Sequence, residues 1–242
     1  MEIRERVVLI TGASAGIGLA TAKRFAAEGA QIALAARSKA ALEQLADALR
    51  AQGTPALAIP TDMREPEQVH AAIAAAAKHF GRLDILINNA GQAAAGTVAD
   101  LSLDDFRQIV DLNVFGPLVA MQAAVPVMRQ QGGGLIINVS SMVSRMRIPG
   151  LGAYAATKAA LNMLSDTARG ELANDSIRVI TVYPRMTATD FGRNSLGNRT
   201  MRSQQRAPSG GDRNIQVDSP ELVAERILDA AIQEPDEQFM DA

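Results

Sequence analysis

A short apolar strand that runs into a glycine-rich turn and then a helix constrains the fold of this chain most. Val7–Ile10 is a β-branched and aliphatic run, as in buried strands. The turn Thr11-Gly12-Ala13-Ser14-Ala15-Gly16-Ile17-Gly18 follows, and helical apolar spacing then continues to Gly29. Glycines let a ligand approach the backbone, and a helix N-terminus can hold an anion. The order predicts a dinucleotide pyrophosphate site; a turn that needs glycine only for its shape is the alternative.

Apolar strands alternate with alanine-rich helices along the chain, which indicates an α/β fold with a doubly wound parallel sheet and helices on both faces. About seven strands are expected in a single domain spanning residues 1–242. Helices are expected at Gly16–Glu28, Lys39–Gln52, Glu65–Phe80, Ser102–Gln131, Ala153–Leu172 and Pro220–Ile232. Strands are expected near residues 7–11, 31–36, 56–60, 84–88, 134–140 and 177–182, with a weak last strand around Gln238–Met240.

Composition excludes several classes of protein. The net charge of −2 gives no reason to expect a nucleic-acid partner. Cysteine is absent, so neither a disulfide framework nor a thiolate metal site can form, which fits a cytoplasmic location. No membrane span and no cleaved signal peptide are expected, because apolar runs are short and the first strand starts near residue 7. His70 and His79 lie in an expected surface helix, so no metal site is predicted there.

The end of the second expected strand indicates which dinucleotide binds. An NAD enzyme usually carries an acidic residue there, roughly 20 residues after the glycines. This chain has Ala36, Arg37 and Ser38 instead. A guanidinium can bind a 2′-phosphate that a carboxylate would repel, so NADP(H) is favoured and NAD(H) stays possible. A solvated surface arginine is the structural alternative.

A tyrosine and a lysine at helical spacing form the candidate catalytic pair. Tyr154 and Lys158 are four residues apart, so they share one face of the expected helix. Ser141 ends the apolar strand that precedes this helix, and Ser140 is its alternative by adjacency. The set suits a phenol that transfers a proton, an ammonium that lowers the pKa of the phenol, and a hydroxyl that holds a carbonyl oxygen. A packed tyrosine, a surface lysine and a strand-end serine are the structural alternatives.

With these motifs the chain resembles the short-chain dehydrogenase/reductase family, in the branch of chains of similar length. The likeness runs from Val7 to about Met240 and implies a Rossmann-type fold and a nicotinamide cofactor. It implies four catalytic residues, Asn113, Ser141, Tyr154 and Lys158. It implies that the cofactor is bound by Gly12, Ser14, Gly16, Ile17, Gly18, Arg37, Ser38, Asp62, Met63, Asn89, Ala90, Gly91, Tyr154, Lys158, Thr187 and Thr189. Asp62 would bond the adenine amino group, and Asn113 would kink its helix.

One position departs from the pattern of the family. After the sixth strand the family has Pro-Gly, whereas this chain has Pro184-Arg185. Arg185 either places a charge near the nicotinamide and an anionic substrate group, or swings out into solvent. The aperiodic segment 190–217, which carries five arginines, is expected to be a mobile substrate lid. Its arginines either attract an anionic substrate or acyl-carrier partner, or keep a loose loop in solution.

The leading functional hypothesis is an NADP(H)-dependent oxidoreductase that interconverts a carbonyl and a secondary alcohol on a small molecule. The alternatives are an NAD-linked alcohol dehydrogenase and a dinucleotide-binding protein with little turnover. The resemblance also implies a homodimer or homotetramer, paired through Ser102–Gln131 and Ala153–Leu172. Arg145 and Arg147, together with nearby methionines, are expected to flank the substrate cleft.

Overall fold

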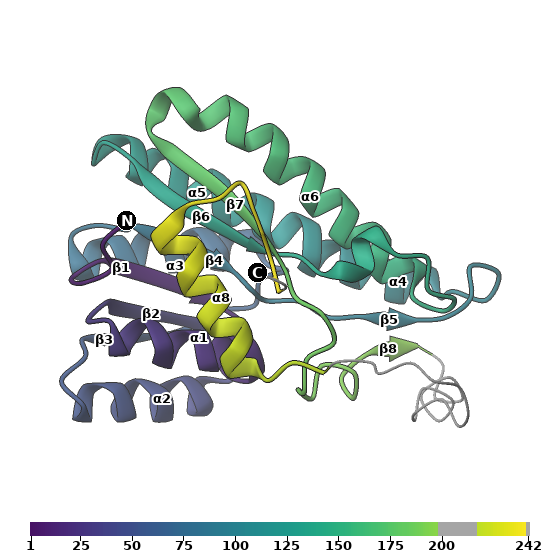
Figure 1. The fold of residues 1–242 in the computed structure, drawn as a ribbon. Coiled ribbons are helices and arrows are strands. Elements are labelled where there is room, and N and C mark those ends of the chain that lie inside the picture. The colour runs from purple at the N-terminus through teal and green to yellow at the C-terminus, as the bar shows by residue number, and fades with distance from the viewer. Residues whose placement is uncertain (198–216, 241–242) are drawn as a thin grey trace.

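The strands form one parallel sheet, as the sequence predicts. The computed structural model describes residues 1–197 and 217–240. Within them, a seven-stranded sheet has the order β3-β2-β1-β4-β6-β7-β9, with every neighbouring pair parallel (Figure 1). The strands are β1 (Val7–Thr11), β2 (Gln31–Ala36), β3 (Ala56–Pro60), β4 (Ile85–Asn88), β6 (Gly134–Val139), β7 (Ile177–Tyr183) and β9 (Glu237–Phe239). The doubly wound α/β fold is therefore confirmed.

Helices cover both faces of the sheet because successive strand side chains point to opposite sides. Val8 and Ile10 of β1 pack in one core with α1 (Gly16–Ala27), α2 (Lys39–Ala51) and α8 (Pro220–Gln233). Val7 and Leu9 pack in the other core with α3 (Pro66–Phe80), α5 (Gly116–Gln130) and the end of α6 (Gly152–Leu172). Both faces being buried explains why the strands read as continuous apolar runs.

The long helix expected at Ser102–Gln131 is interrupted. It consists of α4 (Leu103–Val110), a π-helical turn (Asp111–Phe115) and α5. Within its span Leu103–Gln130, one window of 18 residues has a mean hydropathy of 1.4, as in a membrane helix. The sequence analysis predicts no membrane span. Since α5 packs its apolar face on the sheet and on α3, this segment is a core helix of the domain.

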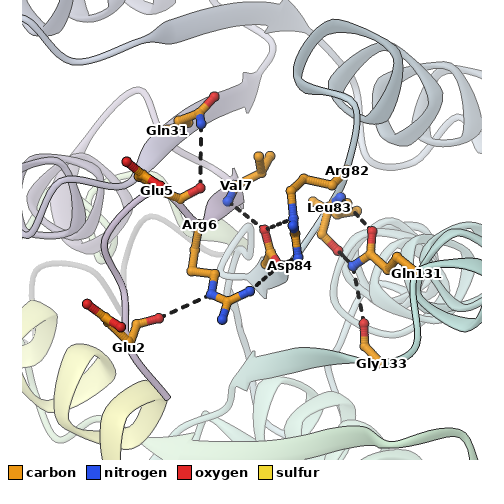
Figure 2. A network of polar contacts seen from close by, with 10 residues as sticks. All are labelled: Glu2, Glu5, Arg6, Val7, Gln31, Arg82, Leu83, Asp84, Gln131 and Gly133. Carbon is orange, nitrogen blue, oxygen red and sulfur yellow. Dashed lines mark hydrogen bonds and ion pairs between the residues drawn. The ribbon is translucent and has the colours of Figure 1, made fainter.

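A polar network fastens the amino ends of the strands (Figure 2). The buried Asp84 carboxylate accepts hydrogen bonds from Val7 N at 2.9 Å and from the guanidinium groups of Arg6 and Arg82. Gln131 bonds the N–H and the carbonyl of Leu83. These contacts join β1, β4 and the start of β6 at the edge opposite the glycine turn.

Two short strands that the sequence did not predict lie outside the main sheet. β5 (Ala94–Ala95) pairs with β8 (Leu196–Gly197) in parallel. Ser195 Oγ also donates to Ala93 O at 3.2 Å. The first part of the predicted lid, 190–197, is therefore attached to the segment after β4. Most of that lid, 198–216, lies outside the described residues, and with it four of its five arginines.

Candidate active site

The glycine turn adopts a conformation that requires glycine. Gly12 and Gly16 have φ of +68° and +54°, in the left-handed region. A Cβ on Gly12 would lie 2.9 Å from Ala90 Cα, and one on Gly16 would lie 3.0 Å from Thr189 Cγ2. A Cβ on Gly18 would lie 2.3 Å from Gly12 O. The turn therefore packs against two segments distant in sequence, which brings the predicted cofactor residues together.

Backbone N–H groups at the start of α1 are not capped by a side chain. Ala15 occupies the N-cap position and provides no side-chain hydrogen bond, whereas Ser38 caps α2 and accepts from Ala41 N. Ser14 and Ile17 flank this turn and are half-buried. Uncapped N–H groups and the positive end of the helix dipole suit a pyrophosphate, which agrees with the dinucleotide site predicted at this turn.

The segment after β4 is fixed to the glycine turn by Thr11. Its hydroxyl accepts from Asn89 N and Ala90 N, each at 3.0 Å, and Asn89 Nδ2 donates to Thr11 O at 2.9 Å. Gly91 follows in the chain, and a Cβ there would be 3.5 Å from Lys158 Nζ. Sequence reasoning missed Thr11 as a positioning residue, although its place at the end of β1 was the available signal.

The predicted adenosine residues gather at the carboxyl ends of β2 and β3. Ala36 pairs with Pro60 in the sheet, so Arg37 and Asp62 follow from adjacent strands. Arg37 is exposed, and the Ser38 hydroxyl caps α2. The side chain of Met63 is buried in the core that α3 and α5 form with the sheet.

The three candidate catalytic side chains converge. The hydroxyls of Ser141 and Tyr154 share a hydrogen bond, and the Lys158 ammonium lies 6.0 Å from the centroid of the Tyr154 ring. Ser141 caps a short 3₁₀ turn, Met142–Arg145, and Lys158 Nζ donates to Val139 O at 2.8 Å. Helix α6 and the end of β6 thus bring these groups together, and Lys158 lies beside Gly91.

Burial shifts the pKa values of Tyr154 and Lys158 so that the neutral form of each side chain is favoured. Tyr154 is 8% exposed, and burial raises its pKa to about 12, although the bond to Ser141 acts in the lowering direction. Lys158 is 3% exposed, and burial lowers its pKa to about 8. The expected lowering of the Tyr154 pKa by Lys158 is not seen here, because desolvation of the phenol dominates.

Asn113 is the central residue of the π-helical turn and is fully buried. Its Oδ1 accepts from Gln92 N at 2.9 Å, and its Nδ2 donates to Gln92 O at 2.8 Å and to Thr157 Oγ1 at 3.0 Å. Thr157 lies between the catalytic pair on α6. Asn113 therefore connects the segment after Gly91 to the catalytic helix, at a local break in the helix as predicted.

Phe191 was not identified from the sequence. Its ring lies 5.5 Å from the Tyr154 ring, centroid to centroid and tilted by 56°. Gln92 Nε2 donates to Asn194 O at 2.6 Å and attaches the same segment to the chain after Gly91. No sequence signal identifies this contact, because the segment has no periodicity and depends on tertiary packing.

Arg185 does not swing out into solvent, which was one of the two positions predicted for it. Its guanidinium bonds both carboxylate oxygens of Asp218 at 3.1 Å, and the Asp218 side chain is fully buried. Asp218 N also donates to Met186 O at 2.8 Å, and Ala188 N donates to Asp218 O at 2.9 Å. This pair fixes the loop that carries the predicted cofactor residues Thr187 and Thr189.

Arg145, which was expected to flank the substrate, packs against two aromatic rings. Its guanidinium carbon lies 4.5 Å from the Tyr183 ring centroid and 5.1 Å from that of Phe239, two rings that stack on each other. Arg145 also bonds Glu237, which accepts from Tyr183 Oη at 2.7 Å. The turn after Ser141 is thereby attached to the C-terminal strand β9.

Residues 6–199 match the family model of the short chain dehydrogenases. The chain belongs to the short-chain dehydrogenase/reductase family. An uncharacterized oxidoreductase of Methylorubrum extorquens is 38% identical over 190 residues, which cover 78% of this chain and 76% of that protein. The predicted family is confirmed, and with it an oxidoreductase that uses a nicotinamide dinucleotide.

Solved structures of the family agree with the fold over nearly the whole chain. A short-chain dehydrogenase/reductase from Burkholderia phymatum, in complex with NAD, has a TM-score of 0.90 at 27% identity and covers 100% of this chain and 90% of its own. An alcohol dehydrogenase from Thermococcus sibiricus, complexed with 5-hydroxy-NADP, has a TM-score of 0.82 at 28% identity and covers 98% and 96%. One of these two structures thus holds NAD and the other an NADP derivative.

Proposed function

We propose that this protein is an NADP(H)-dependent oxidoreductase that interconverts a carbonyl and a secondary alcohol on a small molecule. The hydrogen bond between Ser141 and Tyr154, with Lys158 beside the phenol ring, carries the proposal. Lys158 lies beside Gly91, at the carboxyl edge of the sheet where the uncapped α1 begins. The dinucleotide would supply or accept the hydride.

In this proposal Tyr154 transfers the proton. A pKa of about 12 keeps the phenol protonated at neutral pH, which is the form that donates a proton to a carbonyl oxygen during reduction. Ser141 donates a hydrogen bond to the same oxygen as negative charge develops there. Lys158, with a pKa of about 8, is largely cationic at pH 7 and favours the phenolate that remains. Asn113 holds the catalytic helix in place.

The preference for NADP(H) rests on Arg37. It is an exposed cation directly after β2, where the acidic residue of NAD enzymes is missing. Thr187 and Thr189 would hold the nicotinamide end, since Thr189 already packs on Gly16. An NAD-linked alcohol dehydrogenase is the nearest alternative, and comparison of the dissociation constants of NADPH and NADH separates the two.

One observation favours a dinucleotide-binding protein with little turnover. The Phe191 ring packs near the ring of Tyr154, which is 8% exposed, so a substrate carbonyl has to displace this contact or bind against it. Tight NADPH binding without hydride transfer over a broad panel of carbonyl compounds would favour this alternative.

The test is the loss of NADPH absorbance with a panel of ketones, oxoacyl thioesters, sugars and steroids. Tyr154→Phe removes only the hydroxyl and is expected to lower the rate at least 100-fold. Its affinity for NADPH, read from cofactor fluorescence, is expected to change less than threefold. Carbonyl reduction by Tyr154→Phe at the wild-type rate would show that the assignment is wrong.

We further propose a cytoplasmic homodimer or homotetramer, with residues 190–217 as a lid over the substrate. Leu103, Phe115 and Met163 support an oligomer, because they are apolar and more than half exposed along α4, the π-helical turn and α6. Light scattering after size exclusion measures the oligomeric state.

A further inference from the structure

The environment of Asp62 differs from that of an acid poised only to bond adenine. Arg64 Nε donates to both carboxylate oxygens, at 3.0 and 3.2 Å, and a second guanidinium nitrogen donates to Oδ2 at 2.5 Å. Arg64 N also donates to Oδ1 at 3.0 Å. The contact is therefore a chelating ion pair between residues two apart in the chain, formed where β3 ends.

The pair lies beside Arg37. Thr61 N donates to Ala36 O at 2.9 Å, which joins the residues immediately before Asp62 and Arg37. The hydrogen bond from Arg64 holds the pKa of Asp62 below its usual value, and the charge of Arg37 acts in the same direction more weakly. Asp62 thus interacts with both arginines, and Arg64 is the stronger partner.

The charges at the carboxyl ends of β2 and β3 determine how strongly a 2′-phosphate would bind there. Asp62 and Arg37 alone would sum to zero, so the carboxylate would offset the cation that faces the phosphate. Arg64 supplies the compensating positive charge. The three side chains together then carry a net charge of about +1, which Arg37 presents to the phosphate. Without Arg64, the Asp62 carboxylate would repel a dianionic phosphate bound at Arg37, because charges interact over roughly 10 Å at moderate salt.

We propose that Arg64 determines cofactor specificity by neutralising Asp62, so that Arg37 is available to the 2′-phosphate of NADP(H). This inference rests on the proposed preference for NADP(H). Arg64 acts through Asp62 and is a positioning residue rather than a phosphate ligand. The two arginines and the acid therefore form one unit, in which only Arg37 contacts the ligand.

The test uses the ratio of the dissociation constants of NADH and NADPH, measured by cofactor fluorescence on the purified full chain. The ratio cancels any effect on adenine, which both cofactors share. Arg64→Gln is expected to lower it about fivefold at low salt, and less at high salt. The double variant Arg64→Gln/Asp62→Asn is expected to restore the wild-type ratio, because no carboxylate is left to neutralise. Arg129→Gln, which breaks a similar pair with Asp175 at the opposite edge of the sheet, is the matched control.

Each outcome decides a separate point. An unchanged ratio in Arg64→Gln overturns the inference, and so does a lowered ratio that the double variant does not restore, since Arg64 would then bind the phosphate directly. A wild-type ratio below one contradicts the proposed cofactor preference instead. Even then, the inference about Arg64 is tested by whether the ratio falls in Arg64→Gln and returns to the wild-type value in the double variant.

Discussion

Replacement of Lys158 by methionine is expected to stabilise the fold at neutral pH while it removes the ammonium from the site. Burial lowers the pKa of Lys158 from 10.5 to about 8. At about 1.4 kcal/mol per pH unit, this corresponds to about 3 kcal/mol of destabilisation at pH 7. The lost hydrogen bond to Val139 O costs about 1 kcal/mol. Lys158→Met should therefore raise the free energy of unfolding by about 2 kcal/mol.

The pH dependence of this gain follows from the direction of the shift. Between pH 8 and 10.5 the unfolded chain holds a proton that the folded chain has released, so the wild type becomes more stable as pH rises. Below pH 8 both states are protonated, and the whole penalty is present. The advantage of Lys158→Met should thus be largest below pH 8 and disappear towards pH 10.5. Tyr154 is present in both proteins, so its titration cancels in the difference.

Urea unfolding at pH 7 and pH 9.5, at one fixed protein concentration, measures both effects. Lys78→Met changes an exposed lysine on α3 and serves as the control, with an expected effect within about 0.5 kcal/mol. A variant less stable than the wild type at pH 7, or a gain that does not shrink at pH 9.5, would refute the argument from burial.

Two further substitutions test how the ends of the sheet are held. Arg185→Gly leaves the buried Asp218 carboxylate without its bidentate pair and should cost about 3 kcal/mol in urea unfolding; adding Asp218→Asn should recover at least half, and no recovery would contradict this account. Asp84→Ala should cost about 2 kcal/mol, since Val7 N–H loses its acceptor while the two arginines stay partly solvated. The exposed Asp104→Ala should change less than about 0.5 kcal/mol, and equal losses for the two aspartates would count against the network.

The sequence predicted the elements of the main sheet because local signals agreed with the global fold. Continuous apolar runs such as Val7–Ile10 can be strands only where both faces are buried, and β1 is buried on both. Positive φ at Gly12 and Gly16 likewise matched the expected turn. At Asp111–Phe115 only a kink could be expected, from the family resemblance. The π-helical turn itself was not predicted, since no local propensity specifies an i to i+5 turn.

The partners of single arginines were missed for a different reason. Arg185 and Arg145 could be placed near the cleft from their positions in the chain, but not paired with partners distant in sequence. Asp218 and Glu237 lie 33 and 92 residues away from them. The shift of the Tyr154 pKa was missed in the same way, because desolvation depends on packing that includes Phe191.

The packing of Arg145 against the stacked rings of Tyr183 and Phe239 has a practical consequence for handling the protein. The 3₁₀ turn that Ser141 caps contacts β9 through Arg145. A fusion or deletion directly after β9 is therefore expected to disturb the position of Ser141. The opposite terminus is also engaged, since the Met1 ammonium donates to two carbonyls at the end of α8 and pairs with Glu234 while its side chain packs on the core, so a tag at either end needs a flexible linker.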